Sequence, residues 1–194
     1  MMRIAIFASG SGTNAEAIMN AAKTENLKAE VALIVTDKPK AKVVERASRH
    51  NVPILICDPK QFETKAAYEQ EIVNELQKNE ISFIALAGYM RLIGPTLLNA
   101  FRGRIVNIHP SLLPSFPGLD AIGQAFQAKV KITGVTIHYV DEGMDTGLII
   151  TQEAVRIEVE DTVDTLQKKI QKVEHQLYPS TLQTIIEEIG RLNK

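Results

Sequence analysis

The feature that most constrains this chain is the regular alternation of short apolar runs with helical patterns over its first hundred residues. The runs are apolar at nearly every position, as expected for strands buried on both faces of a sheet. Strands of this kind are joined by crossover helices, so the alternation predicts βαβ units and a parallel sheet. We expect strands at 3–8, 31–36, 53–56, 82–87 and 104–109, and helices near 14–25, 41–50, 65–79 and 95–101.

The pattern changes after residue 109. A proline-rich loop leads to a short helix near 121–129, and two further strands, 133–140 and 148–155, flank the segment DEGMDTG. A long helical pattern starts after residues 160–162, where Asp161 or Thr162 can cap it. We expect Pro179 to break or kink this helix, leaving 180–192 as a last segment. The fold class predicted is α/β, with a doubly wound, mostly parallel sheet of Rossmann-like type and helices on both faces.

The length of 194 residues suits one domain with a substantial core. We expect residues 1–194 to form that domain, with a mononucleotide- or phosphate-binding half at 1–100 and a second half at 101–194 that completes the sheet and the site. We find no internal repeat and no linker composition that would divide the chain further.

Composition narrows the classes of function. Hydrophobic residues make up 45% and charged residues 23%, and the formal net charge is −1 without a sustained run of Lys or Arg. This balance argues against a nucleic-acid-binding surface. The single cysteine, Cys57, fits a reducing compartment, and neither a secretory signal nor a membrane-spanning segment is expected. The expected location is therefore the cytoplasm.

The glycine-rich turn ASGSGTN closes the first expected strand. Gly10 and Gly12 permit a tight turn and a close backbone approach, Asn14 can cap the next helix, and the amides of that helix favour a phosphate. An ordinary β–α turn is the alternative, and no Walker motif follows. A dinucleotide fingerprint is partly met, because Asp37 follows the second strand where a ribose-binding acid would lie. NAD binding therefore stays open.

Two polar residues, Asn107 and His109, lie at the end of an otherwise apolar strand. Side chains two positions apart share one face of a strand, and ligands of doubly wound sheets bind at the carboxyl ends of the strands. An amide and an imidazole are donors suited to an oxyanion that develops during acyl transfer. We favour this hypothesis over a structural pair that only bonds loop backbone.

The segment DEGMDTG places three carboxylates in a loop bracketed by glycines. The spacing does not fit a calcium loop, and a single Asp-Thr-Gly in an α/β chain does not indicate an aspartic protease. An aspartate here can instead orient a histidine and favour its charged form. The four histidines have no ligand spacing, so no metal is expected.

Four motifs, SGSGTN, AGYMRLIG, NIHPSLLPSFPG and GVTIHYVDEGMDTG, closely resemble those of the phosphoribosylglycinamide formyltransferases, folate-dependent enzymes of purine synthesis. The resemblance covers essentially the whole chain and implies the formyltransferase fold. Methionyl-tRNA formyltransferases and formyltetrahydrofolate deformylases look similar around the Asn-x-His pair. They carry an added domain that is not expected in this chain.

The resemblance implies the reaction and the residues. The co-substrate would be 10-formyltetrahydrofolate, the acceptor glycinamide ribonucleotide, and no metal would be used. The partners would be small molecules, with no nucleic acid and no membrane, and a homodimer is compatible with this interpretation. The implied residues are the catalytic Asn107, His109 and Asp145, the ribotide-binding Gly12, Thr13, Asn14 and Glu174, and the folate-binding Lys65, Met90, Arg91, Leu92, Ile93 and Asn107.

The chain departs from the family pattern at a few positions. Lys65 stands where an arginine is common, and Leu148 replaces a common proline. The segment GLDAIGQA lacks histidines that some members carry. Three alternatives remain open: a formyltetrahydrofolate hydrolase, an NAD-dependent oxidoreductase, and a folate- or nucleotide-binding protein without catalysis.

Overall fold

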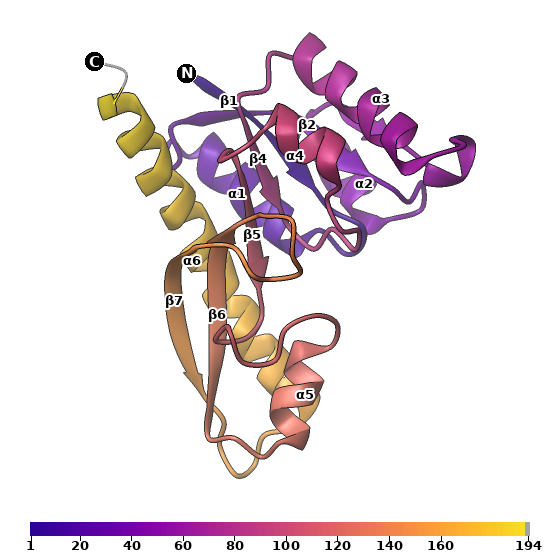
Figure 1. Cartoon of the computed structure of the whole chain (residues 1–194). Helices are drawn as coiled ribbons and strands as arrows, with labels where there is room; N and C mark the ends of the chain where they lie inside the picture. Colours follow the sequence, from indigo (N-terminus) through magenta and orange to yellow (C-terminus); the bar gives the residue numbers. More distant parts are fainter. Residues whose placement is uncertain (193–194) are drawn as a thin grey trace.

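A seven-stranded sheet runs through the computed structural model, which describes residues 1–192 (Figure 1). The strand order is β3-β2-β1-β4-β5-β6-β7. The first five strands pair in parallel, and β6 and β7 are antiparallel, which confirms the mostly parallel α/β sheet predicted from the sequence. The strands are β1 (Met2–Phe7), β2 (Ala29–Thr36), β3 (Ile54–Ile56), β4 (Phe83–Leu86), β5 (Ile105–His109), β6 (Ile132–Tyr139) and β7 (Ile149–Arg156).

Helices cover both faces of this sheet, and alternate strand residues feed two separate cores. In β1, Ile4 and Ile6 pack with residues of α1, α2 and α6, whereas Ala5 and Phe7 pack with residues of α3 and α4. Among residues 1–192, no helix combines the length and apolar character needed to cross a membrane. The helices are α1 (Thr13–Lys23), α2 (Lys42–Arg49), the short η1 (Pro59–Gln61), α3 (Lys65–Lys78), α4 (Pro95–Ala100), α5 (Ala121–Gln127) and α6 (Val163–Leu192).

The break expected at Pro179 does not occur, because α6 continues from Val163 to Leu192 (Figure 1). A proline inside a helix costs about 3 kcal/mol. Here tertiary packing offsets this cost: Tyr178 and Leu182 are fully buried. The Tyr178 hydroxyl donates to the carbonyl of Leu86 at 2.9 Å, which ties the helix to β4. The predicted break was therefore wrong.

The strand order contains a switch point that positions the site. From β1 the chain winds outward to β2 and β3, and it then returns to β4 on the other side of β1. Loops at the carboxyl ends of β1 and β4 consequently diverge, and the space between them is where doubly wound sheets bind ligands. The loop after β5 opens at the same edge, since β5 is parallel to β4.

Candidate active site

A pocket of about 540 Å³ lies at this edge. It is lined by the loops that follow β1, β4 and β5, by the β6–β7 connection and by α6. The structure thus brings together every site residue named from the sequence except Lys65: Gly12, Thr13, Asn14, Met90, Arg91, Leu92, Ile93, Asn107, His109, Asp145 and Glu174.

The glycine-rich turn forms one end of the pocket. Gly12, not Asn14, is the N-cap of α1, with a left-handed φ of 70°, which corrects the cap expected from the sequence. A Cβ on Gly12 would lie 2.6 Å from the Cβ of Val43, so the position has no room for a side chain. The unpaired amides of the first helical turn and the positive end of its dipole are features that favour an anion such as a phosphate.

Asn14 and Glu174 meet beside that turn. The Asn14 amide Nδ2 donates to Glu174 Oε2 at 3.1 Å, which joins the start of α1 to the middle of α6. Burial raises the pKa of the Glu174 carboxyl to about 7, and the Asn14 amide opposes this shift only in part. Glu174 is therefore a carboxyl group that changes charge near neutral pH.

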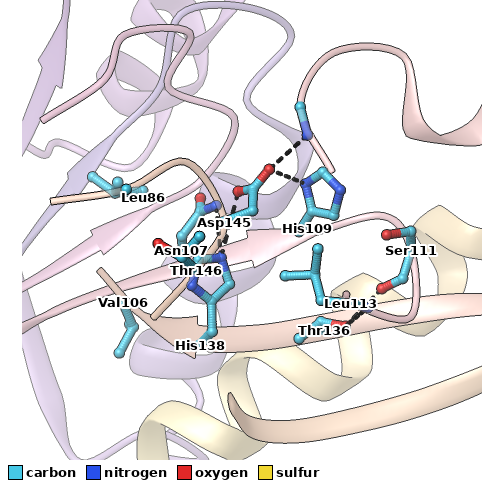
Figure 2. A network of polar contacts seen from close by, with 12 residues as sticks. Leu86, Val106, Asn107, His109, Ser111, Leu113, Thr136, His138, Asp145 and Thr146 are labelled. Carbon is cyan, nitrogen blue, oxygen red and sulfur yellow. Dashed lines mark hydrogen bonds and ion pairs between the residues drawn. The ribbon is translucent and has the colours of Figure 1, made fainter. Parts of the chain in front are cut away.

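The other end of the pocket is built on β5. Val106 and Ile108 point into the core shared with α1 and α6, so Asn107 and His109 lie on the opposite face, as the strand alternation predicted. Antiparallel pairing places Asn107 opposite His138 of β6, and Asn107 Nδ2 lies 3.3 Å from His138 Nε2 (Figure 2).

Both ring nitrogens of His109 face hydrogen-bond acceptors. Nε2 lies 2.8 Å from the carbonyl oxygen of Phe116, and Nδ1 lies 3.4 Å from Asp145 Oδ2. Because a neutral imidazole carries only one N–H, both contacts are satisfied only when both nitrogens carry protons. The protein thus places an acceptor beside each nitrogen of this buried ring.

Asp145 lies between the two histidines, as Figure 2 shows. Its Oδ2 accepts a hydrogen bond from the Gly118 amide at 2.8 Å, and its Oδ1 lies 3.6 Å from His138 Nε2. Burial favours the neutral acid, but the His138 and Gly118 contacts and the charge of His109 outweigh it and lower the pKa of Asp145. Asp145 is consequently an anion at neutral pH.

The loop that contains Asp145 is stabilised by hydrogen bonds between its own residues. Asp145 adopts a left-handed φ of 56°, a conformation that aspartate tolerates better than most residues. Asp141 Oδ1 accepts from the Gly143 amide at 3.0 Å and from the Thr146 hydroxyl at 2.7 Å. A Cβ on Gly147 would lie 1.7 Å from the Tyr139 carbonyl oxygen, so only glycine fits there.

The proline-rich loop after β5 is anchored to the next two strands. The Thr136 hydroxyl accepts from the Leu113 amide at 3.0 Å and donates to the Ser111 carbonyl at 2.7 Å. Gln152 of β7 donates to the Leu113 carbonyl at 2.9 Å. These bonds fix the loop whose Phe116 carbonyl faces His109.

Sequence reasoning missed His138 and Thr136 as parts of this site. The available signal was a pair of polar residues inside the apolar run 133–140, but their partners depend on the antiparallel register of β5 and β6. Lys65 lies instead in an adjoining cavity of about 400 Å³, with Nζ 3.9 Å from Glu69 Oε1. Within residues 1–192, no group of three or more His, Cys, Asp or Glu is arranged to hold a metal ion.

The alternative in which Asp37 binds the ribose of NAD finds no support. Its carboxylate does not line the pocket and is instead paired with Arg91 at 3.4 Å. The pocket combines a glycine-rich turn at a helix N-terminus at one end with an amide, an imidazole and a carboxylate at the other. Fold and site together define an α/β group-transfer enzyme.

Comparison with known proteins identifies the kind of group transfer. The family model described as formyl transferase matches residues 2–182, and the chain belongs to this family. Phosphoribosylglycinamide formyltransferase of Bacillus subtilis is 55% identical over 186 residues, which are 96% of this chain and 95% of that protein. These findings confirm the family predicted from the sequence motifs and make the chain a formyl-transferring enzyme.

Solved structures agree with this assignment. The crystal structure of phosphoribosylglycinamide formyltransferase from Bacillus halodurans is 65% identical, with a TM-score of 0.93 over 95% of each chain. That of glycinamide ribonucleotide transformylase 1 from Symbiobacterium toebii is 41% identical, with a TM-score of 0.95 over 97% of this chain and 89% of that chain. The formyltransferase fold is therefore confirmed.

Proposed function

We propose that this protein transfers the formyl group of 10-formyltetrahydrofolate to the amine of glycinamide ribonucleotide, a step of purine synthesis. The observation that carries the proposal is the convergence of Asn107, His109 and Asp145 in a pocket whose other end is a phosphate-type turn. Relatives that bear the name phosphoribosylglycinamide formyltransferase match nearly the whole chain, which supports the same reaction here.

The acceptor amine is the nucleophile in this proposal. Its nitrogen lone pair attacks the formyl carbon, and the carbonyl electron pair moves onto oxygen to give a tetrahedral intermediate. The Asn107 amide carries two N–H groups, and one of them donates to the oxyanion. No covalent bond to the enzyme is needed, because an amine is already a competent nucleophile.

His109 is the second donor to the oxyanion. To reach it, the ring has to release the Phe116 carbonyl, which Nε2 contacts at 2.8 Å. The Ser111 hydroxyl lies 3.2 Å from the same carbonyl oxygen and can turn to it from the Ser115 carbonyl, which it contacts at 2.6 Å. Catalytic hydrogen bonds commonly tighten only in the substrate complex, so this rearrangement fits the proposed step.

Asp145 keeps His109 charged and oriented. Its anionic form also lets it accept the proton released by the attacking amine, through water, and pass it towards the folate nitrogen as the carbon–nitrogen bond of the donor breaks. The formyl carbon then remains on the acceptor amine, and tetrahydrofolate leaves.

The remaining predicted residues divide between the two substrates. The turn at Gly12, Thr13 and Asn14 would take the ribotide phosphate, and Glu174 would contact its glycinamide end. Met90, Arg91, Leu92 and Ile93 would take the folate, with Lys65 reaching it from the adjoining cavity.

We propose one domain, residues 1–194, with the phosphate-binding turn in 1–100 and the catalytic trio in 101–194. Because Met90 to Ile93 and Glu174 both line the pocket, each half would contribute to both substrates. Small molecules are the proposed partners, without metal, nucleic acid or membrane, in the cytoplasm. Light scattering on the purified protein distinguishes a homodimer from a monomer.

The test is an initial-rate assay that follows the absorbance of the folate with and without glycinamide ribonucleotide. Loss of the formyl group only when the ribotide is present is the expected result. Equal loss without it would identify a hydrolase, the second candidate, in which water replaces the amine. Binding of the folate without turnover in either tube would identify a binding protein.

A further inference from the structure

The wall between the two cavities contains a charged residue, Arg91, that borders both of them. Tyr89, Met90, Arg91, Leu92 and Ile93 line the active-site pocket and also the adjoining cavity that contains Lys65. Arg91 is the only one of these five that carries a charge. The place of its guanidinium therefore decides where a negative ligand group can be held along this wall.

An aromatic platform holds the guanidinium from one side. The Arg91 guanidinium carbon lies 5.7 Å from the centre of the Tyr68 ring. Phe62 packs edge-on against Tyr68 with ring centres 5.7 Å apart, and the Tyr68 hydroxyl is hydrogen bonded to that of Tyr89. Burial raises the pKa of Tyr68 to about 12, so the platform stays neutral.

Asp37 holds the same guanidinium from another side. This residue directly follows β2, its side chain is only 7% exposed, and its Oδ2 lies 3.4 Å from Arg91 Nε. Its other oxygen, Oδ1, is buried and has no hydrogen-bond partner among residues 1–192. Arg91 is thus the cation paired with a carboxylate that water scarcely reaches.

The remaining nitrogens of Arg91 are left for a ligand. Within the described part of the chain, neither Nη1 nor Nη2 makes a hydrogen bond or ion pair, whereas Nε faces Asp37. A guanidinium binds a carboxylate best through two parallel N–H groups, and fixing it in advance lowers the entropy lost on binding.

We propose that Asp37 is a positioning residue that fixes Arg91 for the carboxylate end of the formyl donor. This inference rests on the proposed function, because it takes a folate, with its carboxylates, as the donor. Asp37 contacts neither substrate in this account and acts through Arg91 alone. It gives a role to the acidic residue that the sequence offered as a ribose ligand.

The first test is Asp37→Asn, which keeps the shape of the side chain and removes its charge. We expect the KM for the formyl donor to rise about tenfold, as for the loss of one charge-assisted contact, while kcat and the ribotide KM stay unchanged. Asp164→Asn, which removes an exposed carboxylate outside both cavities, is the matched control and should leave all three values unchanged. An unchanged or lowered donor KM in Asp37→Asn would overturn the proposal.

A donor analogue without the glutamyl carboxylates separates positioning from a structural role. With this truncated donor, wild-type protein and Asp37→Asn should have the same KM, because Arg91 has no carboxylate to bind. A tenfold difference that persists would mean that Asp37 supports the pocket in general, and it would refute the inference.

A double-mutant cycle tests whether the effect passes through Arg91. Asp37→Asn combined with Arg91→Gln should raise the donor KM no further than Arg91→Gln alone, since the positioned group is already absent. Additive effects would show that the two residues act independently and would contradict the proposal.

Calorimetric binding of unformylated tetrahydrofolate keeps this inference distinct from the proposed function. If wild-type protein binds tetrahydrofolate but does not transfer a formyl group, the proposed function is wrong. The double-mutant cycle of Asp37 and Arg91, measured by the Kd for tetrahydrofolate, then still tests the role of Asp37. If wild-type protein transfers the group and Asp37→Asn binds as well as wild type, only the role of Asp37 fails. If neither binding nor transfer occurs, both are overturned.

Discussion

The two ends of the pocket each contain a carboxyl group, one partly buried and one buried, and the pKa values of the two groups are shifted in opposite directions. At the catalytic end, the contacts of Asp145 lower its pKa. At the phosphate-type end, burial raises the pKa of Glu174 to about 7. Glu174 is the more deeply buried of the two, but burial is the largest influence on both groups and favours the neutral acid in each, so the lowered pKa of Asp145 comes from its other contacts.

The difference lies in the number and charge of the donors. Asp145 receives the Gly118 amide and faces two imidazoles, whereas Glu174 receives a single neutral amide from Asn14. One group is therefore a permanent anion that can hold a cation in place. The other can gain or lose a proton near neutral pH, and pairs of this kind often divide the acid and base roles of an active site.

The largest effect should come from Asp145→Asn. The amide cannot hold a charged His109 or accept the proton of the amine, so we expect kcat to fall by about a thousandfold or more. Glu142→Gln, which changes an exposed carboxylate in the same loop, is the control and should keep its activity. A loss below tenfold in Asp145→Asn would break the comparison, because both carboxyls would then be dispensable for chemistry.

Asn107→Ala should have the next largest effect. Removing one donor to an oxyanion costs on the order of a hundredfold to a thousandfold in rate, so we expect kcat to fall by at least about a hundredfold. The KM of the ribotide should change little, because the contact to the oxyanion forms in the transition state, whereas the donor KM should rise modestly because Asn107 is also a predicted folate-binding residue. Steady-state kinetics test this, and a near-normal kcat would remove Asn107 from the mechanism.

Glu174→Gln should affect binding more than chemistry. We expect the ribotide KM to rise about tenfold and kcat to change by less than that, as for the loss of one charged contact to a substrate. The donor KM should stay the same and serves as the internal control. A fall in kcat as large as that of Asp145→Asn would mean that Glu174 is part of the reacting centre.

The smallest effects concern the stability of the fold. The pH range over which stability changes should differ between variants of Glu174 and of Asp145. A raised pKa in the folded state means that ionising Glu174 costs stability between about pH 4.5 and 7. The free energy of unfolding of Glu174→Gln should therefore be higher than that of wild type by on the order of 1–3 kcal/mol at pH 8. Near pH 4 the two values should be the same. Denaturant unfolding at several pH values measures the difference, and a constant difference would contradict the assigned pKa.

Asp145 should behave in the opposite way. Its lowered pKa contributes stability above the usual aspartate pKa, and that contribution is lost as pH falls through the lower folded value. Asp145→Asn should thus be less stable than wild type at pH 6, and the two should converge in acid. If the stability difference from wild type changed over the same pH range and in the same direction in both variants, the contrast between the two carboxyl groups would be refuted.

Much of this site could be predicted from the sequence, because strand alternation and motifs involve residues that are close together along the chain. Asn107 and His109 share a face as predicted, since the period of a strand fixes it. His138 and Thr136 were missed because their neighbours depend on the register between two antiparallel strands, which no local pattern specifies.

Tertiary contacts explain the other departures. Pro179 was expected to end a helix, but the buried Tyr178 and Leu182 keep α6 continuous. The pKa shifts of Asp145 and Glu174 depend on donors far away in the sequence, Gly118 for one and Asn14 for the other. Such contacts arise only when the chain is folded.

The most direct test of the central claim follows the formyl atoms themselves. A donor labelled with heavy carbon and heavy oxygen in its formyl group is incubated with the protein and glycinamide ribonucleotide in ordinary water, and the products are analysed by mass spectrometry. Direct transfer predicts that the ribotide product contains both labels. Labelled formate in place of formylated ribotide, or a product whose oxygen comes from water, would contradict the account.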